Sequence, residues 1–167
     1  MGVIWITGLV GAGKTTIANE IVCRLRADGR AAVLLDGDAL RGAFDERRYD
    51  LETRCTLAVR MSRLAALIEE QGVIAVVATV SLFHEVHALN RRTVKGYFEV
   101  FVDCPLSILK TRTTVYAQSE NDEVVGVGQA AEFPLSPHFI VRNDGAITGI
   151  PSIAAEIVNA WKQHVGV

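Results

Sequence analysis

The sequence has few cysteines, and it does not arrange them as a metal site or a disulfide framework would require. Cys23, Cys55 and Cys104 are odd in number, and no two of them form a C-x-x-C pair. We therefore expect buried or half-buried thiols. The sequence also lacks the H-E-x-x-H spacing of a zinc site, since His84 and His87 lie three residues apart in the segment "HEVH". We interpret these two histidines as a surface or substrate-side pair on a helix.

Neither a large excess of charge nor a long apolar run is present. The 17 lysines and arginines nearly balance the 19 acidic residues, and the net charge of −2 excludes the broad basic face of a nucleic-acid-binding protein. No apolar run reaches the roughly 20 residues of a membrane-spanning helix. Strand-like sequence begins at the third residue, which leaves no room for a cleavable leader. We expect a cytoplasmic protein without a nucleic-acid or membrane partner.

With 167 residues and no internal repeat or linker, we expect residues 1–167 to form a single domain. Short apolar runs alternate with longer helical patterns such as 51–71 and 150–164. The runs are nearly continuously apolar, which is typical of strands covered on both faces in a parallel sheet. The pattern predicts a three-layer α/β fold whose ligands gather at the carboxyl ends of the strands. The five predicted strands are 3–7, 31–36, 73–79, 98–103 and 138–143.

The segment "GLVGAGKTT" directly follows the first predicted strand and precedes a helical pattern. It satisfies the spacing G-x-x-x-x-G-K-[ST], in which glycines allow a tight loop whose amide groups point at a polyphosphate. Lys14 would neutralise the outer phosphates, and the hydroxyl of Thr15 suits a Mg²⁺ ligand. The following helix would add the positive end of its dipole. We expect the nucleotide to be bound by Gly8, Gly11, Ala12, Gly13, Lys14, Thr15 and Thr16.

The second predicted strand ends in "LLDGDALR", beside the phosphate loop in such a sheet. Asp38 is placed to meet both the metal and an acceptor hydroxyl, so we assign it a catalytic role and, with Thr15, the metal. The alternative is that Asp36 and Asp38 only cap the next helix. Arg41 and Arg54 would clamp an anion or a nucleotide through their guanidinium forks, or else they are solvated surface charges.

Residues 113–137 form the only long region without clear periodicity. Polar "AQSENDE" is followed there by glycine-containing "VVGVGQ", a composition that fits a mobile lid, with a surface loop as the alternative. Arg112 precedes this lid segment. At a hinge it would meet the transferring phosphoryl group as the lid closes, in the manner of an arginine finger, so we count it with Lys14 and Asp38 as catalytic.

Two other classes of nucleotide-binding protein fit the sequence less well. The fourth predicted strand ends in "VDCP" and no guanine-reading N-K-x-D follows, which argues against a GTPase switch. No apolar run ends in Asp-Glu, which argues against an ATPase motor. A non-catalytic binding module would not need Lys14, Thr15, Asp38 and Arg41 together. A kinase is therefore favoured, and a binding module or switch stays as the alternative.

Four segments resemble the adenylylsulfate kinase family: "VIWITGLVGAGKTTIA", "LLDGDALR", "EEQGVIAVVATVSLF" and "YFEVFVDCPLSIL". The similarity covers nearly the first 112 residues. It implies a phosphate-loop kinase fold, ATP with Mg²⁺ as donor, a homodimer, and phosphorylation of the ribose 3′-hydroxyl of adenosine 5′-phosphosulfate. It also implies that Asp38 is the catalytic aspartate, that Arg41 and Arg54 bind the acceptor, and that Asn143 lies beside the donor's base.

The chain departs from the family pattern where the acceptor is read. Leu57 stands in place of a substrate-binding asparagine, and Leu82 replaces the proline of an I-S-P turn. The lid segment lacks the family's lysine and has "VVGV" in place of F-T-G-I. These features resemble the branch of cytidine diphosphoramidate kinases of capsule modification, so both acceptors stay open. We expect the acceptor to be bound by Asp36, Arg41, Phe44, Arg54, Ser81, Leu82 and Phe83.

Overall fold

Five parallel β-strands form the centre of the computed structural model, which describes residues 1–116, 124–145 and 149–166. The strands lie in the order β2-β3-β1-β4-β5, so the first strand is central. From β1 the chain passes to the edge strand β2, returns to β3 beside β1, and then continues on the other side with β4 and β5. Each strand falls within a residue or two of its predicted position, and the parallel sheet is confirmed. The strands are β1 (Val3–Thr7), β2 (Ala32–Asp36), β3 (Ile74–Thr79), β4 (Tyr97–Asp103) and β5 (Phe139–Arg142).

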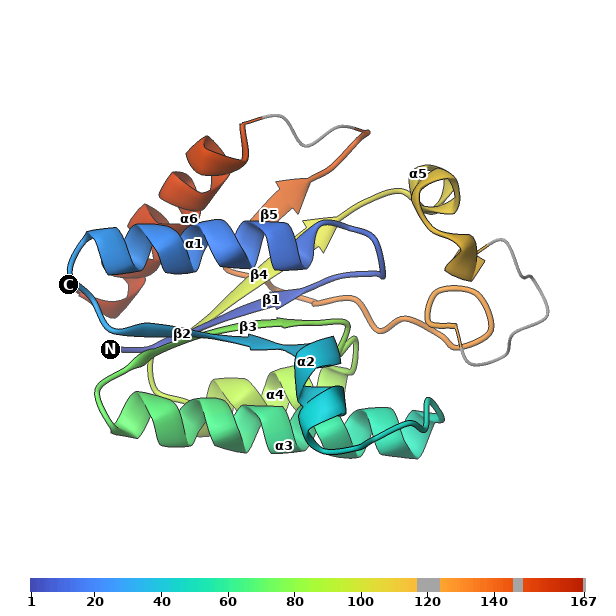
Figure 1. Ribbon diagram of the computed structural model, residues 1–167, viewed down its shortest axis with the longest axis horizontal. Helices are drawn as coiled ribbons and strands as arrows, with labels where there is room; N and C mark the ends of the chain where they lie inside the picture. Colours follow the sequence, from blue (N-terminus) through green and yellow to red (C-terminus); the bar gives the residue numbers. More distant parts are fainter. Residues whose placement is uncertain (117–123, 146–148, 167) are drawn as a thin grey trace.

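Helices cover both faces of this sheet, as predicted (Figure 1). One face carries α1 (Lys14–Ala27) and α6 (Ile150–Val165), and the other carries α3 (Leu51–Glu70) and α4 (His84–Thr93). Two shorter helices, α2 (Gly37–Ala43) and α5 (Leu106–Arg112), lie toward the carboxyl ends of the strands, and a 3-10 turn (Thr114–Tyr116) follows α5. The three-layer α/β architecture is therefore confirmed, and the connections that follow the strands lie at the carboxyl-terminal end of the sheet.

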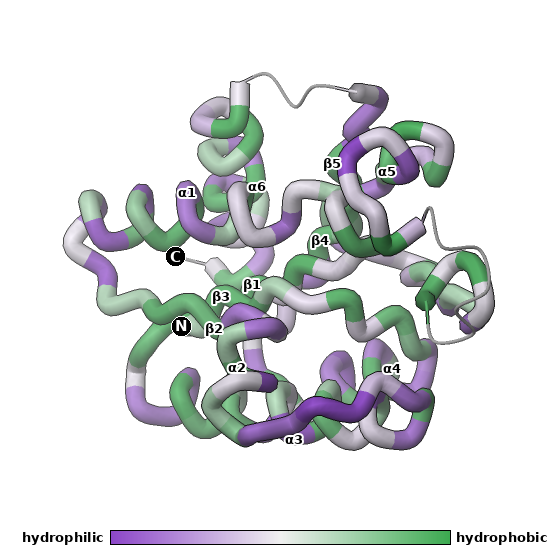
Figure 2. Tube along the Cα trace, turned by 45° about the vertical axis from the view of Figure 1, so that its right-hand side comes forward, coloured by the Kyte–Doolittle hydropathy of each residue, from purple (hydrophilic) through white to green (hydrophobic). Residues whose placement is uncertain are grey.

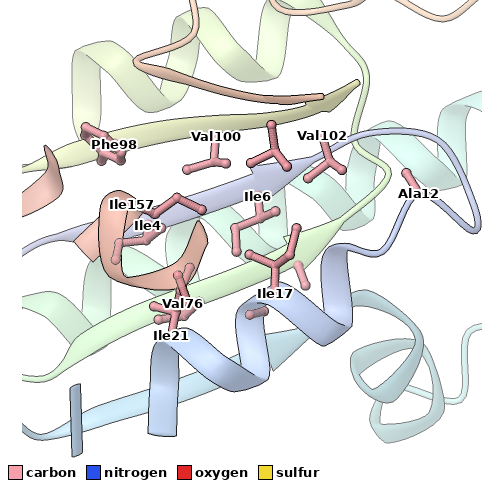
Figure 3. Close-up of a cluster of buried hydrophobic side chains, with 14 of the residues drawn as sticks. Ile4, Ile6, Ala12, Ile17, Ile21, Val76, Phe98, Val100, Val102 and Ile157 are labelled. Atoms are coloured by element: carbon pink, nitrogen blue, oxygen red, sulfur yellow. The ribbon is translucent and has the colours of Figure 1, made fainter. Parts of the chain in front are cut away.

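Alternate residues of β1 supply both cores, which explains why its sequence is continuously apolar. Ile4 and Ile6 face α1, where they meet Ile17 and Ile21 (Figure 3). Trp5 faces the opposite side and belongs to the cluster beneath α3 and α4. In Figure 2 the strands are coloured as hydrophobic, whereas the connection from α2 to α3 is strongly hydrophilic. A strand buried on both faces is the pattern expected of a parallel sheet.

Of two sequence-based expectations about single residues, one holds only in its second alternative and the other is wrong. His87 is not at the surface, since it is 5% exposed, but it lies on the substrate side, with Nε2 2.9 Å from the carbonyl oxygen of Ser81. Cys23 is exposed, because Ile21, Val22 and Leu25 occupy the face of α1 that is buried. The other two thiols fit the expectation: burial raises the pKa of both Cys55 and Cys104.

The part of the chain that the structure describes contains no helix long and apolar enough to cross a membrane.

Candidate active site

The phosphate loop connects the end of β1 to the start of α1. At two of its positions the backbone conformation requires glycine. Gly8 has φ of 152°, and a Cβ there would lie 2.5 Å from the carbonyl oxygen of Val102 on β4. Gly13 has φ of 98° and is the N-cap of α1. A side chain at either position would be strained or would clash. The glycines therefore hold the loop tightly over the positive end of α1, the geometry that binds phosphate in other proteins.

Lys14 is the first residue of α1, and its ammonium group is buried under the loop. Its Nζ donates a hydrogen bond of 2.8 Å to the carbonyl oxygen of Leu9, and the residue is 9% exposed. Burial lowers the pKa of Lys14 to about 8, although the carboxylates of Asp38 and Asp36 pull it upward. Desolvation outweighs these two attractions, so the site is short of negative charge near Lys14. A polyphosphate would supply that charge.

Thr15 is joined to the end of β2. Its Oγ1 donates a hydrogen bond of 2.8 Å to Oδ2 of Asp36. The other oxygen of Asp36 caps α2 by accepting from the amides of Asp38, at 3.0 Å, and Ala39, at 3.2 Å. Asp36 thus performs the capping role and also reaches the phosphate loop. The sequence assigned Thr15 and Asp38 to the metal and Asp36 to the acceptor; the structure bonds Thr15 to Asp36, and the metal assignment stays a prediction.

Asp38 lies in the first turn of α2, exposed and one residue beyond the N-terminal residue of that helix. Its carboxylate acts on the pKa of Lys14 and is the stronger of the two acidic influences there. Asp38 lines the same cavity as Lys14 and Thr15. The acid predicted to receive a proton is therefore close to the cation predicted to hold the donor's phosphates.

Arg41 and Arg54 both lie against Tyr49, an aromatic residue that is not among the predicted site residues. Their guanidinium carbons are 4.4 and 5.2 Å from the centre of the Tyr49 ring, and such cation–π contacts orient the planar groups. Arg41 also donates to the carbonyl oxygen of Arg48 at 2.7 Å, and Arg54 donates to that of Tyr49 at 2.6 Å. The α2–α3 connection thus holds two cations beside the cavity. A lone tyrosine within the charged run "DERRYD" was the available sequence signal.

The acceptor turn, residues 80–83, follows β3 and forms a further wall of the cavity that Lys14, Asp38, Arg41 and Arg54 line. Ser81 is buried and its hydroxyl lies 2.9 Å from that of Thr79. Leu82, at the position where the family has proline, is 1% exposed and lines the wall beside Phe83. Leu57 from α3 is 5% exposed, so the position of the family's asparagine is apolar here.

These parts enclose one cavity of about 680 Å³. It is bounded by the phosphate loop, α2, α3, the acceptor turn and the lid segment, and it is large enough for nucleotide phosphates and a sugar. Of the predicted residues, Gly11, Gly13, Lys14, Thr15, Thr16, Asp36, Asp38, Arg41, Arg54, Ser81, Leu82 and Phe83 line this cavity. The other five, Gly8, Ala12, Phe44, Arg112 and Asn143, do not line it.

Arg112 and Asn143 lie together behind the phosphate loop. Asn143 is 1% exposed, and its Nδ2 donates at 2.9 Å to the carbonyl oxygen of Ala12. Its Oδ1 accepts at 3.2 Å from Arg112, whose guanidinium also lies 3.8 Å from Sγ of Cys104. This chain of contacts braces the loop from the side of β4 and β5. A contact between Arg112 and the transferring phosphoryl group stays a prediction.

The described parts of the lid segment, 113–116 and 124–137, lie against the phosphate loop and the acceptor turn. Tyr116 donates through its hydroxyl to the carbonyl oxygen of Val10 at 3.2 Å. At Gly126, within the "VVGV" sequence, a Cβ would lie 2.9 Å from the side chain of Leu9. The polar "AQSENDE" part of the expected lid is residues 117–123, which lie outside the described residues.

Comparison with known proteins agrees with this geometry. A profile of the family described as adenylylsulphate kinase matches residues 1–142. The adenylyl-sulfate kinase of Paraburkholderia xenovorans is 36% identical over 149 residues, covering 85% of this chain and 83% of that protein. The cytidine diphosphoramidate kinase of Campylobacter jejuni is 34% identical over 130 residues, 75% of this chain and 76% of the relative. A solved APS kinase of Mycobacterium tuberculosis, in complex with AMPPNP and APS, superposes with a TM-score of 0.85 at 28% identity, covering 96% and 97% of the two chains.

The fold and its cavity define a phosphate-loop kinase, an enzyme that transfers a phosphoryl group to a hydroxyl acceptor. Within that class, the chain belongs to the adenylylsulphate kinase family. The family resemblance that the sequence motifs indicated is confirmed.

Proposed function

We propose that this chain transfers the γ-phosphoryl group of ATP to the ribose 3′-hydroxyl of a modified nucleotide, in the manner of an adenylylsulfate kinase. The observation that carries this proposal is the joining of two chemically distinct halves in one cavity. Lys14 and Thr15 form a polyphosphate half, and Arg41 and Arg54 form an anion-binding half. Asp38 lines the same cavity and is close enough to Lys14 to act on its pKa. The related M. tuberculosis structure, a complex with AMPPNP and APS together, supports this pairing of donor and acceptor.

The oxygen groups at the end of β2 fit a magnesium ion. Thr15 Oγ1 and Asp36 Oδ2 are 2.8 Å apart, and Asp38 adds a second carboxylate on the same cavity. Mg²⁺ prefers such hard oxygen ligands, commonly one or two carboxylates together with substrate phosphates. Thr15 with Asp36 or Asp38 would hold it, and the ion would supply positive charge to the phosphate oxygens when bound.

The protein's own groups then position the reactants. The amides of the phosphate loop and the ammonium group of Lys14 hold the donor's outer phosphates. Asp38 orients the acceptor hydroxyl and takes its proton on a carboxylate oxygen. Arg41 and Arg54 bind the acid groups of the acceptor, because guanidinium forks match phosphate and sulfate oxygens in pairs. Phosphoryl transfer needs little more than this alignment and charge.

A second acceptor, a cytidine diphosphoramidate, is favoured by a specific observation. The floor of the cavity is apolar at Leu57, with Ala58 and Met61 beside it on α3, where the family pattern has a substrate-binding asparagine. An acceptor that relied on that amide would lose a hydrogen bond here. The relative from C. jejuni bears the name of this second activity.

We further propose that the whole chain, residues 1–167, acts as one kinase domain and forms a homodimer, as the family resemblance implies. Because the donor is ATP, we expect the reaction to take place in the cytoplasm. Neither point depends on which acceptor is used.

The deciding experiment incubates the protein with ATP and magnesium chloride and a set of acceptors that includes adenosine 5′-phosphosulfate and a cytidine diphosphoramidate. Mass spectrometry detects an acceptor that gains one phosphate. We expect ATP consumption only with an acceptor, and none with the variant Lys14→Ala. ATP hydrolysis without any acceptor would indicate a switch, and ATP binding without turnover would indicate a non-catalytic module.

A further inference from the structure

The acceptor turn, residues 80–83, is held by contacts that no catalytic assignment uses. Buried backbone carbonyl groups require hydrogen-bond donors. Here each of the four carbonyl oxygens of the turn accepts a bond, and the first three donors come from three different elements. Val80 accepts from the hydroxyl of Thr7 at 2.9 Å, Ser81 from Nε2 of His87 at 2.9 Å, Leu82 from the amide of Glu132 at 3.2 Å, and Phe83 from the amide of His87 at 3.1 Å.

His87 approaches the turn from behind. A carbonyl oxygen only accepts hydrogen bonds, so Nε2 of His87 must carry the ring proton that reaches Ser81. The ring is buried, and burial lowers the pKa of His87, which keeps it neutral. The bond therefore fixes the backbone of Ser81, whose side chain lines the cavity next to Thr79.

Glu132 approaches the same turn from the lid segment and holds it twice. Its amide donates to Leu82, and its Oε2 accepts from the amide of His84, the first residue of α4, at 2.6 Å. Phe83 is the N-cap of α4 and has no polar side chain, so the carboxylate of Glu132 supplies the missing cap. A negative charge at this end of the helix is also favoured by the helix dipole. In addition, Nε2 of His84 lies 2.9 Å from the carbonyl oxygen of Phe133.

We propose that His87 and Glu132 are positioning residues of the acceptor pocket, which clamp the turn that carries Ser81 and Phe83 from the α4 side and from the lid side. This inference rests on the proposed function only in naming the pocket as the acceptor's. Neither residue lines the cavity, so each acts through the turn. Glu132 also links the lid segment to the acceptor wall, because its main chain bonds to Leu82 in the turn and its side chain bonds to His84, directly after the turn.

The test for Glu132 compares Glu132→Ala and Glu132→Gln with the control Glu85→Ala. Glu85 is an exposed acid in the first turn of α4, the helix that Glu132 caps, so it places the same charge near the N-terminal end of the α4 dipole. We expect Glu132→Ala to raise the KM for the acceptor by about tenfold while the KM for ATP stays within about twofold, a split that general destabilisation does not produce. Glu132→Gln retains an accepting oxygen and should recover much of the loss. Equal changes in both KM values, or an equal effect of Glu85→Ala, would overturn the role of Glu132.

The test for His87 compares His87→Leu with His87→Gln. Leucine fills the buried space without a donor, whereas glutamine can still donate to Ser81. We expect His87→Leu to raise the acceptor KM as Glu132→Ala does and His87→Gln to restore it in part. If both variants behave alike, the bond to Ser81 has no positioning role.

A second measurement, amide hydrogen exchange, tests the clamp without depending on which acceptor the protein phosphorylates. Amide hydrogen exchange at residues 81–84 should become about tenfold faster in Glu132→Ala and His87→Leu, with the phosphate loop unchanged. In Glu132→Ala the amide of His84 loses its carboxylate acceptor, and in His87→Leu the carbonyl oxygen of Ser81 loses its donor, so the backbone around the turn opens more readily. Unchanged exchange at these residues would overturn the clamp. Should the wild-type protein phosphorylate none of the acceptors tested, the proposed function fails, and the exchange measurement still decides whether these residues hold the turn.

Discussion

The hydroxyl of Thr15 donates to the carboxylate of Asp36 across the end of a strand that lies between them. Thr15 follows β1 and Asp36 ends β2, but β3 separates these two strands in the sheet. The bond closes because Gly37 brings the chain directly over the end of β3, where a Cβ would lie 3.4 Å from the carbonyl oxygen of Ala78 and from the hydroxyl of Thr79. The nucleotide half and the acidic half of the cavity are thus joined before any ligand binds.

Nucleotide affinity should depend on pH through Lys14. In the free protein its pKa is about 8, so the ammonium group loses its proton as the pH rises above that value. Bound phosphates favour the charged form and raise this pKa, so binding above about pH 8 takes up a proton, and affinity falls by up to about tenfold per pH unit. Fluorescence titration with a labelled ATP from about pH 7 to about pH 9.5 checks this, since phosphate groups with a pKa near 6 are already ionised there.

The matched control is Lys14→Arg, whose guanidinium stays charged throughout this range. Its affinity should be flat with pH, whatever its absolute value. A wild-type affinity that is equally flat would show that the Lys14 ammonium group does not lose its proton as described.

Asp38→Asn should separate binding from transfer. The amide keeps the size of the side chain but cannot take the hydroxyl proton, so we expect the transfer rate to fall about a hundredfold or more while ATP affinity is retained. Single-turnover kinetics together with ATP titration measure the two effects. Asp45→Asn is the control, because Asp45 is an exposed acid on the α2–α3 connection, paired only with Arg47 among the described residues. Full activity of Asp38→Asn would remove Asp38 from the mechanism.

The strands and the phosphate loop were predictable because local sequence determines them. A continuous apolar run must be covered on both faces of the sheet. Gly8 and Gly13 adopt positive φ angles that other residues avoid. The position of Asp38 followed from the sheet, since the ends of neighbouring strands share one edge.

What was missed depends on contacts between distant segments. The burial of His87 follows from how α4 packs on the sheet, and a short segment such as "HEVH" does not reveal which side of the helix is covered. The pairing of Thr15 with Asp36 depends on the close approach at Gly37. Tyr49 became significant only because Arg41 and Arg54, on either side of it in the sequence, both fold back onto its ring.

Gly126→Ala, a substitution in the lid segment, should weaken the binding of ATP at the phosphate loop. Gly126 has φ of 90°, and a Cβ there would lie 2.9 Å from Cδ2 of Leu9, so alanine strains the backbone and pushes against the phosphate loop. The control Gly72→Ala has a similar φ of 81°, but its Cβ would meet open space in the described part of the chain. Both should lose about 1 kcal/mol of stability or somewhat more from backbone strain. Only Gly126→Ala should raise the KM for ATP, as steady-state kinetics would show, and equal kinetics for the two variants would mean that the contact with Leu9 is irrelevant to the donor.

Leu57→Asn tests which acceptor the cavity is shaped to take. Leu57 is 5% exposed and lines the floor of the cavity on α3, so asparagine would present an amide to the acceptor while giving up apolar contacts with the core. We expect kcat/KM for adenosine 5′-phosphosulfate to rise by about tenfold, the value of one hydrogen bond to a buried partner, and the free energy of unfolding to fall by about 1–3 kcal/mol. Kinetics with adenosine 5′-phosphosulfate and with a cytidine diphosphoramidate, alongside urea denaturation, measure the two effects separately. Leu57→Met keeps the floor apolar and should leave the preference between the two acceptors unchanged. If Leu57→Asn also leaves it unchanged while the protein stays folded, the residue at this position does not decide the acceptor, and the altered lid segment becomes the region that does.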